Sequence, residues 1–202
     1  MKNFSTKRLC RAGIIAALYA ALTYAFMPFA FGPFQIRPAE ALCILALFYV
    51  EAIPALWIGC MLSNLGSPYF VYDVLIGSLA TLLAAFSTYM VGLFIKKDGV
   101  RFAVGGIFPV LFNAFIIPLI IVFLCGGGEG YSSLSVAYFS YVASIGVTEL
   151  IWVYGLGWPL YASVNKLRSR FLPFSRINKS PAPHNTQNSH SSIDKDTKNE
   201  NQ

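Results

Sequence analysis

The sequence predicts an all-α integral membrane protein with six transmembrane helices, of which the second and third are short, and with both termini in the cytoplasm. Three observations lead to this fold class. Of the 202 residues, 56% are hydrophobic and only 12% are charged, a composition typical of polytopic membrane proteins. Long apolar segments recur from about residue 12 to residue 164. The lysines and arginines gather in short clusters that separate these segments.

Four segments are long enough to cross a bilayer, which requires roughly 20 apolar residues in an α-helix. They cover about residues 9–29, 73–95, 102–124 and 135–164. The remaining apolar stretch, residues 38–66, is too long for one span and short for two, and Glu51 and Pro54 interrupt it. Proline breaks the hydrogen-bond ladder of a helix, so two short helices that meet near Glu51 are the alternative to a single span.

The positions of the basic residues decide between these alternatives. They precede the first segment, separate segments 73–95 and 102–124, and follow the last segment: Lys2, Lys7, Arg8, Arg11, Lys96, Lys97, Arg101, Lys166, Arg168 and Arg170. Basic residues that flank spans stay on the cytoplasmic side. All of these clusters lie on one side only if residues 38–66 cross twice. We therefore expect six spans, and the net charge of +6 then reflects topology and no nucleic-acid partner.

We expect residues 1–173 to form one transmembrane substrate-binding domain and residues 174–202 to form a disordered cytoplasmic tail, which has too few apolar side chains to pack. The four cysteines lack CxxC spacing and both histidines lie in that tail, so we expect no metal site, disulfide framework or cofactor. The sequence also lacks a GxxxxGK[ST] nucleotide-binding motif and a nucleophile elbow, which argues against an enzyme.

Polar side chains in or beside the apolar segments are the candidate substrate-binding residues, because such groups are costly in a membrane and mark functional sites. On the six-span topology they converge on the outer half of the bundle, and they are Arg37, Glu40, Asn64, Asp73, Asn113 and Glu149. Structural alternatives stay open: an interfacial Arg37–Glu40 pair, a helix cap at Asp73 and interhelical hydrogen bonds at the asparagines. Glu149 is the strongest candidate, because no basic residue lies near it in sequence at membrane depth.

The charges of this set indicate the chemistry of its ligand. Three carboxylates against the single guanidinium of Arg37 leave about −2, which favours a cationic or donor-rich solute. Trp152 follows Glu149 by three residues and shares its face if the helix is regular, so we add Trp152 to the candidate site. An acidic group beside an aromatic ring suits a planar heterocycle with several N–H groups. For Glu51, at the inner turn, we expect a structural role.

The first helix carries two rows of small residues at four-residue spacing. One row is Ala12, Ala16 and Ala20, and the other is Gly13, Ala17, Ala21 and Ala25. Small residues let a second helix approach closely. Two interpretations stay open, namely internal packing and a docking surface for a second membrane protein. Active transport would in any case need an energy source on another chain, because the nucleotide-binding motif is absent from this sequence.

Residues 31–89, together with PVLFNAFI at 109–116 and VTELIWVYGLGWPL at 147–160, resemble the QueT family of queuosine-precursor transporters. The resemblance implies the six-helix fold of a substrate-binding S component of an energy-coupling factor (ECF) transporter, without enzymatic activity, in the cell membrane. It implies a 7-deazaguanine ligand such as 7-aminomethyl-7-deazaguanine. It also implies a transmembrane coupling protein and two cytoplasmic ATPases as partners, with the small-residue rows as the docking face.

Two alternatives to this function remain. One is an S component for a different vitamin or nucleobase, because a fold does not determine its ligand. The other is a non-transporting membrane scaffold subunit, whose polar groups would only hold the helices together.

Overall fold

The computed structural model describes residues 6–31 and 34–171, except for the side chains of residues 169–171. The chain divides into two compact units, Met1–Lys166 and Leu167–Gln202. Of the second unit, the described part is the end of the last helix, and the tail expected at 174–202 lies outside the described residues. The fold and the site described below belong to the first unit.

The described residues are helical and contain no strand, as the sequence predicts. Their helices join into six segments: α1 (Thr6–Ala25) with the short α2 (Met27–Ala30); η1 (Pro38–Leu47); α3 (Ala52–Asn64); α4 (Phe70–Tyr72) with η2 (Asp73–Gly77) and α5 (Ser78–Phe94); α6 (Asp98–Leu119) with η3 (Ile120–Leu124); and α7 (Leu134–Leu150) with η4 (Ile151–Leu156) and α8 (Gly157–Phe171). Three of these are long and apolar enough to cross a membrane, Phe70–Phe94, Asp98–Leu124 and Leu134–Arg168. The number of membrane crossings stays a prediction.

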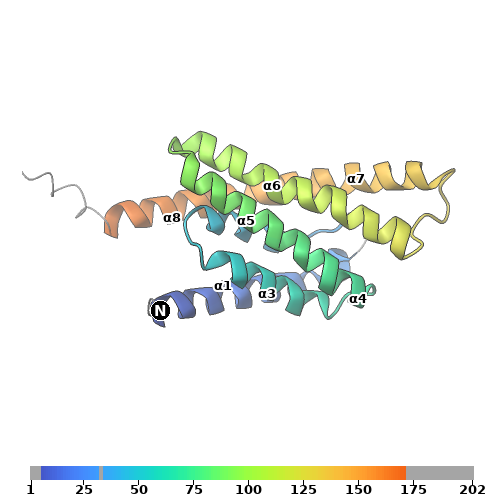
Figure 1. Cartoon of the computed structure of the whole chain (residues 1–202), viewed down its shortest axis with the longest axis horizontal. Helices are drawn as coiled ribbons and strands as arrows, with labels where there is room; N and C mark the ends of the chain where they lie inside the picture. Colours follow the sequence, from blue (N-terminus) through green and yellow to red (C-terminus); the bar gives the residue numbers. More distant parts are fainter. Residues whose placement is uncertain (1–5, 32–33, 172–202) are drawn as a thin grey trace, which may run out of the picture. The chain divides into compact units, whose positions relative to one another are not determined.

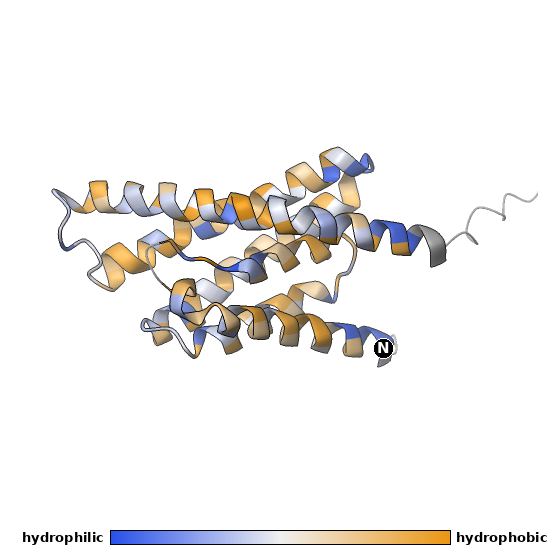
Figure 2. Cartoon of the chain, turned by 180° about the vertical axis from the view of Figure 1, so that it is seen from behind, coloured by the Kyte–Doolittle hydropathy of each residue, from blue (hydrophilic) through white to orange (hydrophobic). Residues whose placement is uncertain are grey.

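The helices of the first unit run roughly along one axis (Figure 1). Helix α1 packs on α3, α3 on α5, α5 on α6 and α6 on α7. The start of α1 and the α5–α6 turn lie at one end, and α4 and the α6–α7 connection lie at the other. The helices are largely hydrophobic along their length, with polar residues toward their ends (Figure 2). Large apolar side chains such as Leu75, Phe94 and Phe139 are exposed, as expected where a helix faces lipid.

Helix η1 is the centre of the unit, and it is a 3₁₀-helix rather than the expected α-helix. All ten of its residues are buried, and it contacts α1, α3, α5, α6 and η4. A 3₁₀-helix is narrower than an α-helix and rises about 2.0 Å per residue instead of 1.5 Å. Ten residues therefore reach about 20 Å, farther than an α-helix of the same length.

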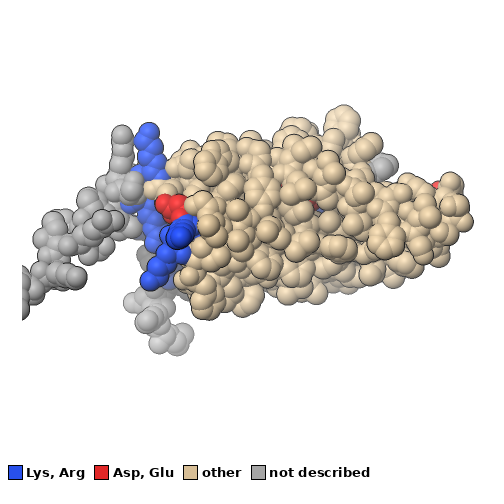
Figure 3. Space-filling model, turned by 90° about the horizontal axis from the view of Figure 1, so that it is seen from above, with Lys and Arg blue, Asp and Glu red and all other residues tan. Residues whose placement is uncertain are grey.

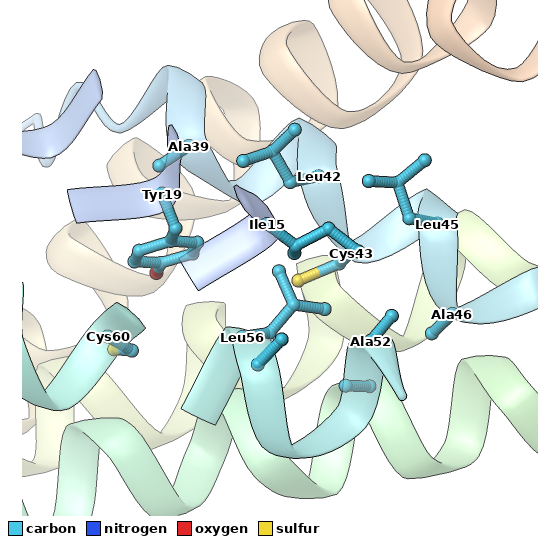
Figure 4. Close-up of a cluster of buried hydrophobic side chains, with 12 residues drawn as sticks. Ile15, Tyr19, Ala39, Leu42, Cys43, Leu45, Ala46, Ala52, Leu56 and Cys60 are labelled. Atoms are coloured by element: carbon cyan, nitrogen blue, oxygen red, sulfur yellow. The ribbon is translucent and has the colours of Figure 1, made fainter. Parts of the chain in front are cut away.

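Glycines let the neighbouring helices approach η1 closely. A Cβ atom on Gly92 of α5 would lie 2.5 Å from the carbonyl oxygen of Leu47, and one on Gly105 of α6 would lie 2.7 Å from the Leu47 side chain. Contacts this short do not occur between real atoms. At Gly92 the obstacle is backbone, so only glycine fits there, whereas a Cβ atom at position 105 would require the Leu47 side chain to move. A second core lies between α1, η1 and α3, where Tyr19, Leu42, Cys43 and other buried side chains meet (Figure 4).

Each of the three long helical segments contains a π-helical stretch that the sequence did not predict: η2, η3 and η4. Such stretches are rare and frequently lie at functional sites. Two of them adjoin candidate residues, because η2 begins at Asp73 and η4 begins two residues after Glu149.

Basic side chains gather at one end of the first unit (Figure 3). There the turn between η1 and α3 is fixed by two arginines. Arg11 pairs with Glu51 at 2.7 Å and lies over the Tyr49 ring. Arg101 donates to the Leu47 carbonyl. Glu51 thus has the structural partner expected for it, and the starts of α1 and α6 meet at the same end, as the positive-inside argument requires.

Candidate functional site

The six polar residues singled out from the sequence are all buried, with side chains at most 5% exposed. They come from the segment before η1 and from η1, α3, η2, α6 and α7, and are Arg37, Glu40, Asn64, Asp73, Asn113 and Glu149. Buried polar groups are stable only when they are hydrogen-bonded or meet a ligand. Their partners therefore separate structural groups from candidate binding groups.

The first group of contacts joins three elements through Arg37. Its Nη2 donates to Asn64 Oδ1 at 2.8 Å, and its Nε donates to the Ala30 carbonyl at 3.2 Å. Asn64 Nδ2 in turn donates to the Asp73 carbonyl at 2.7 Å, and the Ser67 hydroxyl donates to the Asp73 carboxylate. This network ties the segment before η1 to the end of α3 and the start of η2.

Two structural alternatives considered for these residues are wrong. Arg37 donates to Asn64 and Ala30 instead of pairing with Glu40, because Glu40 turns toward α1. Asp73 does not cap the start of a helix with its side chain, since helical structure begins three residues earlier at Phe70. Its carboxylate is buried inside the bundle instead.

Glu40 has two partners within the protein. The Tyr19 hydroxyl of α1 donates to Glu40 Oε1, and the Cys43 thiol lies 3.4 Å from Oε2. Both carboxylate oxygens are thus engaged. Tyr19 and Cys43 are residues that sequence reasoning missed. Tyr19 follows Ile15 and precedes Thr23 at four-residue spacing, and these three form the buried face of α1. The sequence alone could not distinguish that face from the exposed apolar faces of the same helix.

The second group of contacts is incomplete. Asn113 Nδ2 donates to Glu149 Oε1 at 3.2 Å. The other oxygens of the pair, Asn113 Oδ1 and Glu149 Oε2, are buried without a hydrogen-bond partner. A carboxylate only accepts, so the amide must present its NH₂ group to Glu149 and leave its oxygen as a further acceptor. The pair therefore offers two open acceptors, each of which costs about 1–3 kcal/mol if it stays unsatisfied.

The two groups of contacts are near enough to interact electrostatically. Glu149 interacts electrostatically with Glu40 and Arg37, and Arg37 interacts with Asp73 and Tyr19. Three carboxylates thus interact with one guanidinium, and the four groups together carry a formal charge of −2 when all are ionised. A ligand that supplies N–H donors or a positive charge complements this arrangement.

Comparison with known proteins assigns the chain to a family. The family model described as QueT transporter matches residues 9–166. The chain belongs to the QueT transporter family. All six polar residues lie inside the matched range, and the resemblance seen in the sequence is confirmed. No curated protein and no solved structure gave a match.

Family membership makes this protein a membrane transporter with a small-molecule substrate. The buried acceptors of Glu149 and Asn113 suit such a substrate, since they lack partners within the described protein. In the part of the chain that the structure describes, no group of three or more His, Cys, Asp or Glu side chains is arranged to hold a metal ion.

Trp152 lies in η4, and its side chain is half-buried. Its ring meets that of Phe26 edge-on, with 6.2 Å between the centroids. The expectation that it shares a face with Glu149 assumed a regular α-helix, whereas the π-helical stretch begins at Ile151, between the two residues. Trp152 therefore stays a candidate for contact with a ring of the substrate. The α-helical spacing, however, no longer predicts that its side chain lies on the same face as Glu149.

The two small-residue rows of α1 differ in environment. Ala12, Ala16 and Ala20 are half-buried, and a Cβ atom on Gly59 of α3 would lie 2.9 Å from the Ala16 carbonyl oxygen. This row serves internal packing against α3. Gly13, Ala17 and Ala21 are exposed, and a Cβ atom on Gly13 would meet nothing within 4 Å. Of the two rows proposed as a docking surface, only the second is exposed.

Proposed function

We propose that this QueT-family protein is the substrate-binding S component of an ECF transporter, and that it binds a queuosine precursor outside the cell and delivers it inward with a coupling module. The substrate is a 7-deazaguanine base such as 7-aminomethyl-7-deazaguanine. The protein has no enzymatic activity of its own and is a multi-pass protein of the cell membrane.

The observation that carries this proposal is the pair of open acceptors at Glu149 Oε2 and Asn113 Oδ1. A 2-amino-6-oxo base presents a ring N–H and an exocyclic NH₂ group side by side. A carboxylate accepts both in a bidentate, charge-assisted pair. The ligand thereby satisfies buried oxygens that otherwise have no partner, so binding removes a penalty that the empty bundle carries.

The charge of the site supports a substrate with an aminomethyl group. That group is a cation at neutral pH, and the site holds three carboxylates against one guanidinium. Two of these carboxylates, Glu40 and Asp73, already accept hydrogen bonds from Tyr19 and Ser67. We infer that Glu149 binds the ring edge, while Glu40 or Asp73 faces the aminomethyl cation through its remaining lone pairs.

The proposed topology has six crossings with both termini cytoplasmic. The shorter apolar helices η1 and α3 form a hairpin-like pair, of which η1 is fully buried, and their connecting turn is bound by Arg11 and Arg101. If this turn is cytoplasmic, the basic starts of α1 and α6 lie on the same side, in agreement with the positive-inside rule.

The partners in this proposal are one transmembrane coupling protein and two cytoplasmic ATPases, since the sequence has no nucleotide-binding motif of its own. The exposed row of Gly13, Ala17 and Ala21 on α1 is the proposed docking face for the coupling protein. Small residues there let a partner helix approach within van der Waals distance of the backbone.

Titration of the purified chain with 7-aminomethyl-7-deazaguanine tests the substrate and the role of Glu149. In Glu149→Gln an NH₂ group can face the donors of the base, so we expect a loss of about 2–4 kcal/mol, or roughly 30- to 1,000-fold in affinity. Glu51→Gln is the matched control: it neutralises another buried carboxylate, but one that pairs with Arg11 at the basic end, and it should leave the affinity unchanged.

Unchanged affinity in Glu149→Gln would refute the assignment of Glu149. Failure of the unaltered chain to bind any deazaguanine, with no small heterocycle found by mass spectrometry after purification, would refute the proposed substrate. Binding of a different vitamin or nucleobase in the same screen would keep the S-component function and change its ligand.

A further inference from the structure

A pocket of about 320 Å³ lies between α4 and the end of η3, at the end of the first unit opposite the basic one (Figure 1). Its lining includes three aromatic side chains, Tyr69, Phe70 and Tyr72, together with Leu124 and Cys125 where η3 ends. Cavities of this size are typical of small-molecule sites. On the six-span topology proposed above, this end faces the outside of the cell, so a substrate meets the pocket before it reaches the buried site.

Hydrogen bonds connect the wall of this pocket to the buried network. The Tyr69 amide donates to Ser67 Oγ at 3.0 Å, and the Ser67 hydroxyl donates to the Asp73 carboxylate. The Asp73 amide donates back to the Tyr69 carbonyl at 3.0 Å. Since the Asp73 carbonyl also accepts from Asn64, the pocket adjoins the residues that hold Arg37.

The negative charge of Asp73 reaches the pocket. Burial raises the pKa of the Cys125 thiol, and the nearby Asp73 carboxylate raises it further. Asp73 is buried, and no salt bridge joins it to a described residue. Arg37 interacts with it electrostatically but donates to Asn64 Oδ1. A cation in the pocket is therefore attracted by a carboxylate that lies in a region of low dielectric constant.

The aromatic rings of the pocket suit the same kind of solute. The face of such a ring is partly negative, so it stacks on flat ring systems and attracts cations. Phe70 and Tyr72 are 47% and 41% exposed, which leaves ring surface accessible to a solute. A planar base with a positively charged substituent complements both the rings and the carboxylate.

We propose that this pocket is an outer subsite of the transporter, in which the rings of Phe70 and Tyr72 hold a planar cationic base before it moves to the buried acceptors of Glu149 and Asn113. The inference rests on the proposed function, which supplies the class of substrate. The outer subsite raises the concentration of a dilute solute beside the buried site. Through Asp73 it also favours a base with a positive substituent over a neutral one.

Maleimide labelling of Cys125 in the full-length protein measures whether the pocket is occupied. Cys10 is exposed and is replaced in Cys10→Ser, whereas Cys43 and Cys60 are buried. We expect 7-aminomethyl-7-deazaguanine to slow the labelling. The neutral 7-cyano base should need roughly threefold or more the concentration for half-protection. Protection should persist in Glu149→Gln, because Glu149 does not line the pocket.

Variants of the rings assign this protection to the pocket. In the Glu149→Gln background, Tyr72→Ala should raise the concentration of base that gives half-protection roughly two- to tenfold. Tyr72→Phe should restore the protection, because stacking requires the ring and not the hydroxyl. Phe70→Ala is a second variant with the same expected loss. Phe139→Ala is the matched control, since it removes an exposed ring of α7 outside the pocket, and it should leave protection unchanged.

Unchanged labelling of Cys125 in the presence of a base that titration shows to be bound would overturn the outer subsite and leave the proposed function standing. Equal protection in Tyr72→Ala, Phe70→Ala and Phe139→Ala would do the same, because the rings would then serve only as anchors at the membrane interface. If the unaltered chain binds neither base in the titration, the proposed function itself fails.

Discussion

Replacing Arg37 by alanine removes the guanidinium from the buried network and should destabilise the bundle by about 3 kcal/mol. Its bond to Asn64, at 2.8 Å, is charge-assisted, and such bonds contribute about 1.5–3 kcal/mol. The guanidinium carbon lies 4.9 Å from the centroid of the Phe31 ring, a cation–π contact worth about 0.5–2 kcal/mol. The bond to Ala30, at 3.2 Å, is longer. Contacts that share a residue are not additive, so we expect about 3 kcal/mol rather than the full sum.

Thermal unfolding of the purified variants in one detergent measures this effect. A loss of about 3 kcal/mol corresponds to roughly 6–12 °C in the midpoint of a chain of this size. Arg8→Ala is the matched control, because Arg8 is exposed and its removal should change stability by less than about 0.5 kcal/mol. Arg37→Lys keeps the charge without the planar fork and should fall between them. If Arg37→Ala unfolds at the same midpoint as Arg8→Ala, the network has no structural role.

Two further predictions concern packing and docking. Gly92→Ala should destabilise the bundle by about 1–3 kcal/mol, because the new Cβ atom would lie 2.5 Å from the Leu47 carbonyl oxygen. Gly155→Ala is its control in the same thermal unfolding assay, because a Cβ atom at that position would meet nothing within 4 Å. Equal unfolding midpoints for the two variants would contradict the close approach of α5 to η1. Ala17→Leu on the exposed row of α1 should abolish co-purification with the coupling protein and leave the affinity for the base unchanged. Its control, Ala143→Leu on the exposed face of α7, should preserve both the co-purification and the affinity. Intact co-purification of Ala17→Leu would rule out the row as the docking face.

The sequence predicts the positions of the helices better than their form. Apolar length and the placement of lysine and arginine indicate where each helix begins and ends, because a bilayer requires these patterns. The 3₁₀ form of η1 has no such signature. Its residues are buried on every side, so PAEALCILAL has no polar face whose period could distinguish a 3₁₀-helix from an α-helix. The close approach of Gly92 and Gly105 is a property of the packed bundle.

Burial of the polar residues is also predictable, but their pairing is not. A carboxylate or amide within an apolar segment must turn inward, and all six candidates do so. Which partner each one finds depends on the relative rotation and shift of helices that are distant in sequence. Arg37 and Glu40 are three residues apart, yet one binds α3 and the other α1.

The three buried carboxylates of the candidate site differ in a way that favours binding over a structural role. A polar group that only holds helices together is satisfied by its partners, as Glu40 is by Tyr19 and Cys43. If position 149 had only a structural role, an apolar residue there would avoid the free-energy cost of removing a carboxylate from water. Glu149 instead has one donor, from Asn113, and one oxygen without a partner. A transporter must release its substrate as well as bind it. The penalty of leaving the acceptors without hydrogen bonds strengthens substrate binding only while water cannot reach them. We propose that an opening of the bundle would hydrate Glu149 and Asn113, remove that advantage and thereby favour release of the substrate.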